Sequence, residues 1–313
     1  MTTLRRVLAV PAGRVSLVVL LGVLVLVAFG GALAPHDPLA QNTTDMLQGP
    51  SSAHLLGTDY LGRDVLSRLM AGSRLSVLGS LEAVVVAMAL GVVPGMASAW
   101  FGRRLEWLTL RVTDTLMVLP FTVFAIAVVG TLGNGLHQSM VAIGVLMTPL
   151  YFRVTRAATL GLRQAQYVEA AELMGASQWF VLRRHIWSKV LPTVAVTTAQ
   201  ALGTALLVMA SLTFLGLGVT PPAPSWGGML GSDLAYLTQQ AWAPLVPGAM
   251  IMLTVGALNL LADVIRDAGS APDPVSRGWR RNAAAVVGVA APAPAPAAAG
   301  ETEEDRDVTA PAA

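Results

Sequence analysis

Side chains that commonly bind metals or act as nucleophiles are few in this 313-residue chain, which contains no Cys. Its four histidines are His36, His54, His137 and His185. Helical zinc sites place two His residues in an H-x-x-x-H or H-E-x-x-H pattern, and no pair here has that spacing. No G-x-S-x-G nucleophile elbow occurs either. The sequence therefore predicts no metal site and no catalytic residue.

Nucleotide hydrolysis is also excluded from this chain. A P-loop requires G-x-x-x-x-G-K-[ST], because backbone N–H groups and the lysine hold the phosphates. The single lysine, Lys189, follows Ser188 and precedes Val190, so the motif is missing. We therefore expect no bound cofactor in this chain and no enzyme activity of its own.

The segment 167–192 combines charged, aromatic and turn-forming residues. The composition of Tyr167–Met174 favours a helix, and Gly175 suits the left-handed residue that ends one. Ser177 can cap a second, apolar helix, and Pro192 is typical of the first turn of a further helix. From the residues alone, this helix–turn–helix either lies on lipid headgroups or is covered by a partner protein.

Membrane-spanning helices must position the residues of the segment 167–192. Hydrophobic residues make up 54% of the chain and charged residues 12%, and the mean hydropathy is +0.64. Soluble domains carry about 25% charged residues, whereas a bilayer is spanned by about 20 apolar residues. The predicted fold is an all-α polytopic membrane bundle with six transmembrane helices. The predicted spans are Val15–Leu33, Leu75–Trp100, Trp107–Val129, Met140–Tyr151 with its flanks, Pro192–Leu217 and Trp242–Leu261.

Basic residues orient these spans, because cytoplasmic loops are enriched in Arg and Lys. With a cytoplasmic N-terminus, only three of the 20 basic residues fall in outer segments, namely Arg63, Arg68 and Arg74. We therefore expect a multi-pass protein of the cell membrane, in contact with the lipid bilayer and with both termini in the cytoplasm. The net charge of +2 and the absence of a basic face predict no nucleic-acid partner.

The spans divide the chain into four parts. Residues 1–34 contain the N-terminal cytoplasmic segment and the first helix, and residues 35–74 form an outer loop. Residues 75–269 form the transmembrane core, with a cytoplasmic loop at 152–191. The tail 270–313 contains Ala-Pro repeats and an acidic cluster, a composition that predicts disorder.

Polar side chains within the spans are candidates for lining a solute pathway. The fifth span has a stripe of small polar residues at helical spacing: Thr193, Thr197, Gln200, Thr204 and Ser211. The stripe either lines the pathway or forms hydrogen bonds between helices. Glu82, inside the second span, either lines the pathway or forms a structural hydrogen bond, because an unpaired charge in a membrane is costly. Arg111 and Asp114, spaced i, i+3, can pair as a functional element, or Arg111 only snorkels to the headgroups with Asp114 as its counter-ion.

A family resemblance accounts for the segment 167–192. The run Glu169-Ala170-Ala171, followed by Gly175, Ile186 and Leu191-Pro192, resembles the EAA loop of ABC-importer permease subunits. Segments 54–68, 214–227 and 259–268 resemble the dipeptide/oligopeptide/nickel branch of these permeases, and the first of them favours the C-type subunit of the permease pair. One departure is Ser188, where the family often has Pro.

The resemblance implies a type I ABC-importer permease fold and a loop that docks against an ATP-binding subunit. It assigns the docking to Glu169, Ala170, Ala171, Glu172, Gly175, Ile186, Leu191 and Pro192. It also implies three kinds of partner: a second homologous permease, two ATP-binding subunits and an extracytoplasmic solute-binding protein. The expected solute is a peptide.

Other functions stay open at this point. A permease of the same class could import nickel or another small solute. An ion-coupled secondary transporter is a further alternative, although the inverted repeats typical of that class are not visible in the sequence. An intramembrane enzyme is disfavoured, because the chain has no nucleophile or metal motif.

Overall fold

The computed structural model of the protein describes residues 7–270, and the predicted tail from residue 271 onward lies outside the described residues. The described residues are helical, with no strand among them and one isolated bridge between Thr58 and Asp64. The helices are α2 (Pro11–Leu33), η1 (Thr43–Asp45), α3 (Val65–Trp100), α4 (Arg103–Val118), α5 (Phe121–Leu132), α6 (Leu136–Arg163), α7 (Gln166–Leu173), α8 (Gln178–Val181), η2 (Leu182–Ile186), α9 (Trp187–Phe214), α10 (Trp226–Leu234) and α11 (Leu245–Ser270). The prediction of an all-α membrane bundle is confirmed.

Four helices are long and apolar enough to cross a membrane: Pro11–Leu33, Val65–Trp100, Gln178–Phe214 and Leu245–Ala268. The count of six spans is not confirmed. The prediction of one helix over Trp107–Val129 is wrong, because α4 ends at Val118 and α5 begins at Phe121. Leu119 has extended backbone, as expected for a residue that precedes a proline, and Pro120 is the N-cap of α5.

Close packing of α3 against α6 forms the centre of the bundle. The sequence shows Gly91 and Gly95 on one face of α3, and in the structure this face lies directly against α6. A Cβ at Gly91 would overlap Tyr151 and the Thr148 carbonyl, and a Cβ at Gly95 would overlap the Phe152 carbonyl. These glycines therefore let the two backbones approach more closely than any other residue would allow.

A second apolar cluster fastens α10 to the bundle. The Trp226 side chain is fully buried, and its indole Nε1–H donates to the Leu69 carbonyl at 3.0 Å. The Trp226 backbone N–H donates to Ser76 Oγ, also at 3.0 Å. Val23, Leu206 and Ile251 belong to the same cluster, so residues of α2, α9 and α11 meet beside α10.

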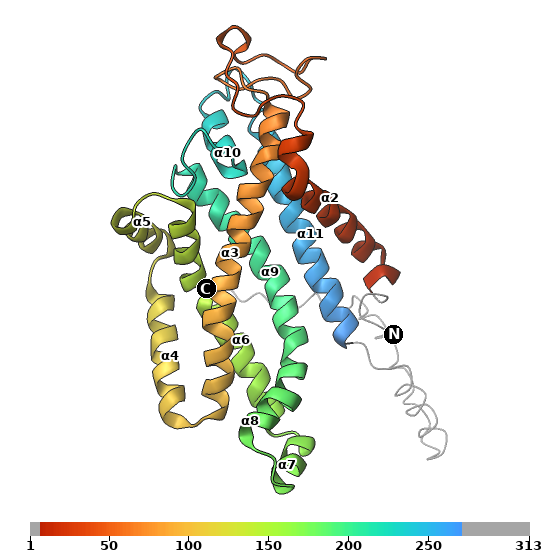
Figure 1. Ribbon diagram of the computed structural model, residues 1–313, viewed down its shortest axis with the longest axis vertical. Coiled ribbons are helices and arrows are strands. Elements are labelled where there is room, and N and C mark those ends of the chain that lie inside the picture. The colour runs from red at the N-terminus through yellow and green to blue at the C-terminus, as the bar shows by residue number, and fades with distance from the viewer. Residues whose placement is uncertain (1–6, 271–313) are drawn as a thin grey trace, which may run out of the picture. The chain divides into compact units, whose positions relative to one another are not determined.

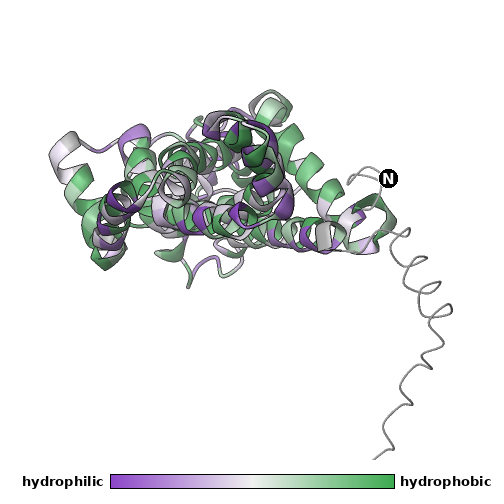
Figure 2. Cartoon of the chain, turned by 90° about the horizontal axis from the view of Figure 1, so that it is seen from below, coloured by the Kyte–Doolittle hydropathy of each residue, from purple (hydrophilic) through white to green (hydrophobic). Residues whose placement is uncertain are grey.

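The two ends of the bundle carry the segments of functional interest. In Figure 1, residues 34–64 and α10 lie at the upper end, whereas α7 and α8 lie at the lower end. Apolar side chains face outward along the helices between these ends, and Figure 2 shows green ribbon on several outer faces of the helices. Val18 and Met252 are each 70% exposed. Such surfaces suit lipid or a partner helix rather than water.

Candidate functional site

The segment 166–186 at the lower end of the bundle folds as a helix, a tight turn and a second helix. Gly175 has φ +83° and ends α7, as predicted from the sequence. Its N–H donates to the Glu172 carbonyl at 2.9 Å, and the Ala176 N–H donates to the Ala171 carbonyl at 3.0 Å. These two bonds make up a Schellman motif, which satisfies carbonyls that the helix end leaves free.

The second helix begins at the predicted cap but continues further than predicted. Ser177 Oγ accepts the Phe180 N–H at 3.3 Å, so the predicted N-cap is confirmed. The prediction that a new helix begins at Pro192 is wrong, because helical backbone continues from Gln178 to Phe214 through the π-helical turn Leu182–Ile186, and Pro192 lies inside α9. Proline removes one backbone hydrogen bond. Burial of the neighbouring Val190 and Val194 against the core offsets this cost.

Buried side chains fix the segment 166–186 to the bundle, while its turn is exposed. Val168 and Val181 are at most 1% exposed and belong to the central core. Leu173 and Met174, directly before the turn, are 83% and 82% exposed. An anchored segment with an apolar turn has the properties of a docking element, because burying these side chains against a partner removes apolar area from water.

The predicted docking residues, two of which lie beyond this segment in α9, divide into exposed and buried ones. The exposed members are Glu169, Ala170, Glu172, Gly175, Leu191 and Pro192. Ala171 and Ile186 instead face the core, where they are 6% and 0% exposed. Sequence reasoning missed Leu173 and Met174. The sequence does contain a signal for them, because these two large apolar residues directly precede the glycine that ends a short polar helix.

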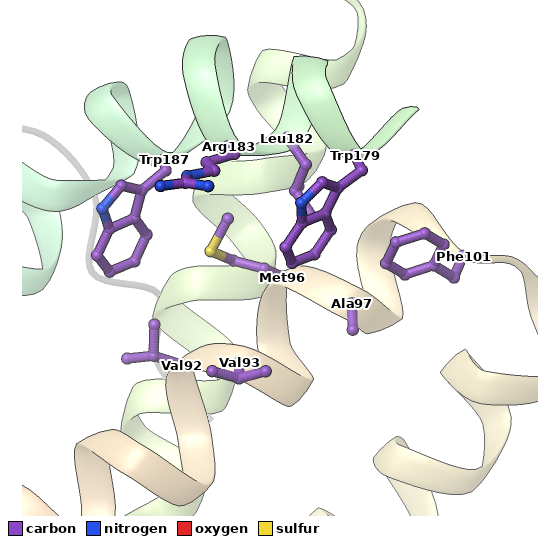
Figure 3. Close-up of a pocket in the computed structure, with 9 residues that line it drawn as sticks. All are labelled: Val92, Val93, Met96, Ala97, Phe101, Trp179, Leu182, Arg183 and Trp187. Carbon is purple, nitrogen blue, oxygen red and sulfur yellow. The ribbon is translucent and has the colours of Figure 1, made fainter. Parts of the chain in front are cut away.

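An apolar pocket lies between this segment and the lower end of α3. It has a volume of about 410 Å³ and is shown in Figure 3. Trp179, Leu182, Arg183 and Trp187 line one side of it, and the opposite side comes from α3 and the residue that follows it. The sequence predicts an apolar second helix, and the structure leaves the Trp179 side chain of this helix 64% exposed.

The predicted pathway residues on α9 do not share one environment. Thr197 is 6% exposed and Gln200 is half-buried, whereas Thr204 and Ser211 are exposed. The hydroxyls of Thr197, Thr204 and Ser211 donate to carbonyls of their own helix at 2.9–3.2 Å. Their role in a pathway stays a prediction.

Of the three charges predicted to lie within the spans, Glu82 and Asp114 have partners on another helix. On α3, Glu82 pairs with His137 at the start of α6. The predicted pair of Arg111 with Asp114 is wrong, because Asp114 Oδ1 instead accepts from Arg153 of α6 at 3.3 Å. The Arg111 guanidinium lies over the Trp107 ring, 5.9 Å from its centroid. Packing of α4 against α6 brings the Arg153 side chain within reach of Asp114.

At the upper end, the loop 34–64 is held by a network of buried charges. Asp59 Oδ2 accepts from Arg63 Nε at 2.7 Å, and Arg68 Nε lies 3.5 Å from the same oxygen. On α10, Asp233 is 5% exposed, and no hydrogen-bond partner reaches its Oδ2 within residues 7–270. Burial, together with the negative charge of Asp59, raises the pKa of Asp233 to about 6.

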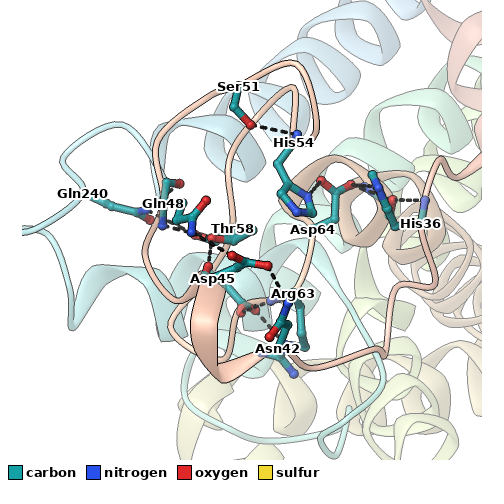
Figure 4. Close-up of polar contacts among 12 residues, drawn as sticks. His36, Asn42, Asp45, Gln48, Ser51, His54, Thr58, Arg63, Asp64 and Gln240 are labelled. Atoms are coloured by element: carbon teal, nitrogen blue, oxygen red, sulfur yellow. Dashed lines mark hydrogen bonds and ion pairs between the residues drawn. The ribbon is translucent and has the colours of Figure 1, made fainter.

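Polar contacts also tie the loop to distant parts of the chain. Figure 4 shows Gln240, which follows α10, reaching the loop. Its Nε2 donates to the carbonyls of Gln48 and Thr58 at 3.0 and 3.2 Å. The loop is therefore a fixed part of the upper end and can present a defined surface.

Asp64 ends the loop and caps α3. Burial alone raises the pKa of Asp64, but hydrogen bonds from Ser67 and His54 outweigh it and hold the pKa below its usual value. The carboxylate is therefore ionised at neutral pH.

Comparison with known proteins gives consistent matches. The sequence model described as "Binding-protein-dependent transport system inner membrane component" matches residues 87–269. The model described as "N-terminal TM domain of oligopeptide transport permease C" matches residues 2–50.

Curated relatives match most of the chain. A probable D,D-dipeptide transport system permease of Escherichia coli K12 is 37% identical, covering 82% of this chain and 86% of the relative. A glutathione transport system permease of Pectobacterium atrosepticum is 38% identical, covering 85% of this chain and 87% of the relative. A nickel transport system permease of Escherichia coli K12 is 36% identical, covering 74% of this chain and 84% of the relative.

A solved structure shares the fold. A chain of the MetNI methionine ABC transporter, in an inward-facing conformation, matches with a TM-score of 0.54 at 16% sequence identity. The match covers 64% of this chain and 96% of the transporter chain.

Proposed function

Since the chain belongs to the family of binding-protein-dependent transport system inner membrane components, as a permease of the dipeptide, glutathione and nickel class of ABC importers, we propose that it forms a membrane pathway for peptides. The pathway lies between this chain and a second, homologous permease. Two ATP-binding subunits drive transport, and an extracytoplasmic solute-binding protein delivers the solute.

The single observation that carries this proposal is the anchored segment 166–186 with its exposed apolar turn. We assign the turn, with Leu173 and Met174 at its tip, to the contact with an ATP-binding subunit. Glu169 and Glu172 are exposed on the same short helix and can orient the contact through charge. The buried Val168 and Val181 then transmit any movement of the partner directly to the helix core.

Alternating access follows from this arrangement. Closure of the ATP-binding subunits moves the docked turn, and the attached α9 moves with it. Thr204 and Ser211, exposed on α9, then line the pathway between the two permeases. ATP supplies a difference in affinity between the inward-facing and outward-facing states, as any driven conformational change requires.

This arrangement assigns directions to the two ends of the bundle. Segment 166–186 faces the cytoplasm, and the loop 34–64 faces the solute-binding protein outside the cell membrane. The N-terminus and the C-terminal end of α11 then lie in the cytoplasm. The fixed carbonyl contacts of Gln240 keep the outer loop in one conformation for that contact.

Peptide is the proposed solute because peptide and glutathione permeases of similar length cover most of this chain. Nickel is the second candidate, since a nickel permease is 36% identical to the chain.

Reconstitution with the partner subunits tests the proposal. The chain is purified with its cognate permease and ATP-binding subunits and placed in proteoliposomes with the solute-binding protein. We expect ATP-dependent uptake of a labelled dipeptide, with labelled glutathione and ⁶³Ni²⁺ as competing solutes. Uptake of nickel without peptide uptake would reassign the solute. Uptake by the permeases alone, without ATP-binding subunits, would refute the proposed mechanism.

A further inference from the structure

Three side chains that metal ions prefer meet at the upper end of the bundle, although they are far apart in the sequence. His36 follows α2, His54 lies in the middle of the loop and Asp64 is the N-cap of α3 (Figure 4). One ligand atom from each lies within 4.8 Å of the other two. The ring centroids of His36 and His54 are 4.8 Å apart.

Hydrogen bonds outside the cluster hold each of the three residues in place. Asp64 Oδ2 accepts from the Ser67 backbone N–H at 2.8 Å and from Ser67 Oγ at 2.6 Å. Ser67 Oγ also accepts the His36 backbone N–H at 3.0 Å. The His54 backbone N–H donates to Ser51 Oγ at 3.0 Å. The cluster is therefore built by the fold and does not depend on a contact between the two imidazoles.

The two oxygens of the Asp64 carboxylate have different partners. Oδ2 is used by the helix cap, while Oδ1 faces His54 Nδ1 at 2.9 Å. His36 Nδ1 lies 3.8 Å from Oδ2, too far for a hydrogen bond. A hydrogen bond to Asp64 explains the position of His54 but not that of His36, whose ring nitrogen also points toward the same carboxylate.

The spacing of the ligand atoms suits a small transition-metal ion. Zinc binds imidazole nitrogen and carboxylate oxygen at about 2.0–2.2 Å, so tetrahedral ligand atoms lie about 3.4 Å apart. His54 Nδ1 lies 2.9 Å from Asp64 Oδ1 and His36 Nδ1 lies 3.8 Å from Oδ2, on either side of this value. The three ligand atoms all lie within 4.8 Å of one another, so a bound ion must draw the most separated of them together. The His36 side chain is 44% exposed and Asp64 only 2%, so one side of the cluster is open to ions and water.

From this geometry we propose that His36, His54 and Asp64 bind a divalent transition-metal ion, with water in the remaining coordination position. Two imidazoles and one carboxylate are a ligand set suited to Zn²⁺, Ni²⁺ and Cu²⁺. The ion joins the end of α2, the middle of the loop and the start of α3. This proposal is independent of the transported solute, because its ligands come from the loop and not from the helices proposed to line the pathway.

Direct metal binding to the full-length chain tests the proposal. The protein is purified in detergent with a tag that contains no histidine, stripped of metal with a chelator and dialysed against Zn²⁺. We expect one tightly bound equivalent by elemental analysis, and Co²⁺ in its place to give visible absorption bands of a coordinated ion. Bound Zn²⁺ must also raise the melting temperature of the protein, because it binds the folded state.

Matched variants distinguish this cluster from other histidines. His54→Asn and Asp64→Asn each remove one ligand, and the asparagine introduced by the second substitution can still cap α3. We expect each to weaken Zn²⁺ binding by about 100-fold or more, since even residues that only support ligands account for about 10–100-fold. His185→Asn, which alters a histidine in η2, must leave binding and the Zn²⁺-dependent melting shift unchanged.

Three results would overturn the proposal. The first is no Zn²⁺ bound by the wild-type chain at micromolar concentration. The second is unchanged Zn²⁺ binding in both His54→Asn and Asp64→Asn, with melting temperatures that show the variants to be folded. The third is loss of the bound ion in His185→Asn, which would place the metal elsewhere.

Discussion

Replacing Gly175 by Val tests whether the left-handed end of α7 is needed for coupling. No heavy atom lies within 4 Å of a Cβ placed at Gly175, so the added side chain has space. Its effect must therefore come from the backbone, which has φ +83°. An L-residue in that region costs about 1–2 kcal/mol, and a β-branched one lies at the upper end.

The magnitude follows from this cost. About 2 kcal/mol lowers the equilibrium ratio of the native turn to its alternatives about 30-fold, since every 1.4 kcal/mol is a factor of 10. The Schellman bonds of Gly175 and Ala176 are lost with the turn, and Leu173 and Met174 then point away from their docking position. We expect Gly175→Val to lower co-purification with the ATP-binding subunits and ATP-driven uptake by about tenfold or more.

Gly175→Asn is the matched control. Asn adopts the left-handed conformation more readily than other residues with a side chain, so this variant adds polar bulk but keeps the turn. Uptake in proteoliposomes and stimulation of ATP hydrolysis by the loaded binding protein are measured for both variants. Equal activity of the two variants, whether both active or both inactive, would refute the argument from backbone conformation.

Three further predictions concern packing, ionisation and the pathway. Gly91→Leu must lower the melting temperature in detergent, because overpacking costs about 1–3 kcal/mol or more. Gly22→Leu, where no atom lies near the added Cβ, must leave the melting temperature unchanged. Equal melting temperatures of the two variants would contradict the α3–α6 contact. The folded pKa of Asp233 is raised from 3.8 to about 6, so its ionisation destabilises the fold as pH rises through this interval. Asp233→Asn must therefore raise the free energy of unfolding above pH 6, by up to about 3 kcal/mol, and must leave it unchanged below pH 4. Chemical denaturation at several pH values measures this difference, and stabilisation that grows as the pH falls would contradict the prediction. Because the chain has no Cys, Thr204→Cys gives a single thiol on the exposed face of α9. This thiol must react with a water-soluble reagent in the assembled transporter, in a nucleotide-dependent way. The buried Ala201→Cys must not, and an unreactive Thr204→Cys in every state excludes the pathway role.

Local chemistry explains which features could be predicted from the sequence. The turn at Gly175 and the cap at Ser177 depend on residues only a few positions apart, and both are present as expected. The close contact at Gly91 is similarly visible as small residues on one helix face. Helix boundaries were less predictable at prolines. Pro120 separates two helices, while Pro192 is accommodated inside one. Leu119, before Pro120, has extended backbone, whereas the residues around Pro192 stay helical and Val190 and Val194 are buried in the core.

Features that depend on the path of the chain could not be predicted. Asp114 pairs with Arg153, 39 positions away, because α4 packs against α6. The cluster of His36, His54 and Asp64 follows no spacing rule, since its members come from a loop whose path is set by distant contacts. The H-x-x-x-H and H-E-x-x-H patterns describe ligands on one helix, whereas this cluster joins three separate positions of the chain.

The unbroken helix from Gln178 to Phe214 has a mechanical consequence. At about 1.5 Å per residue, its 37 residues form a rod about 55 Å long. Tilting such a rod by about 5° displaces its far end by about 5 Å, more than the diameter of a water molecule. A small rotation imposed at Trp179 therefore becomes a displacement of useful size near Phe214, and the π-helical turn Leu182–Ile186 and Pro192 are the two points along the rod where it can bend.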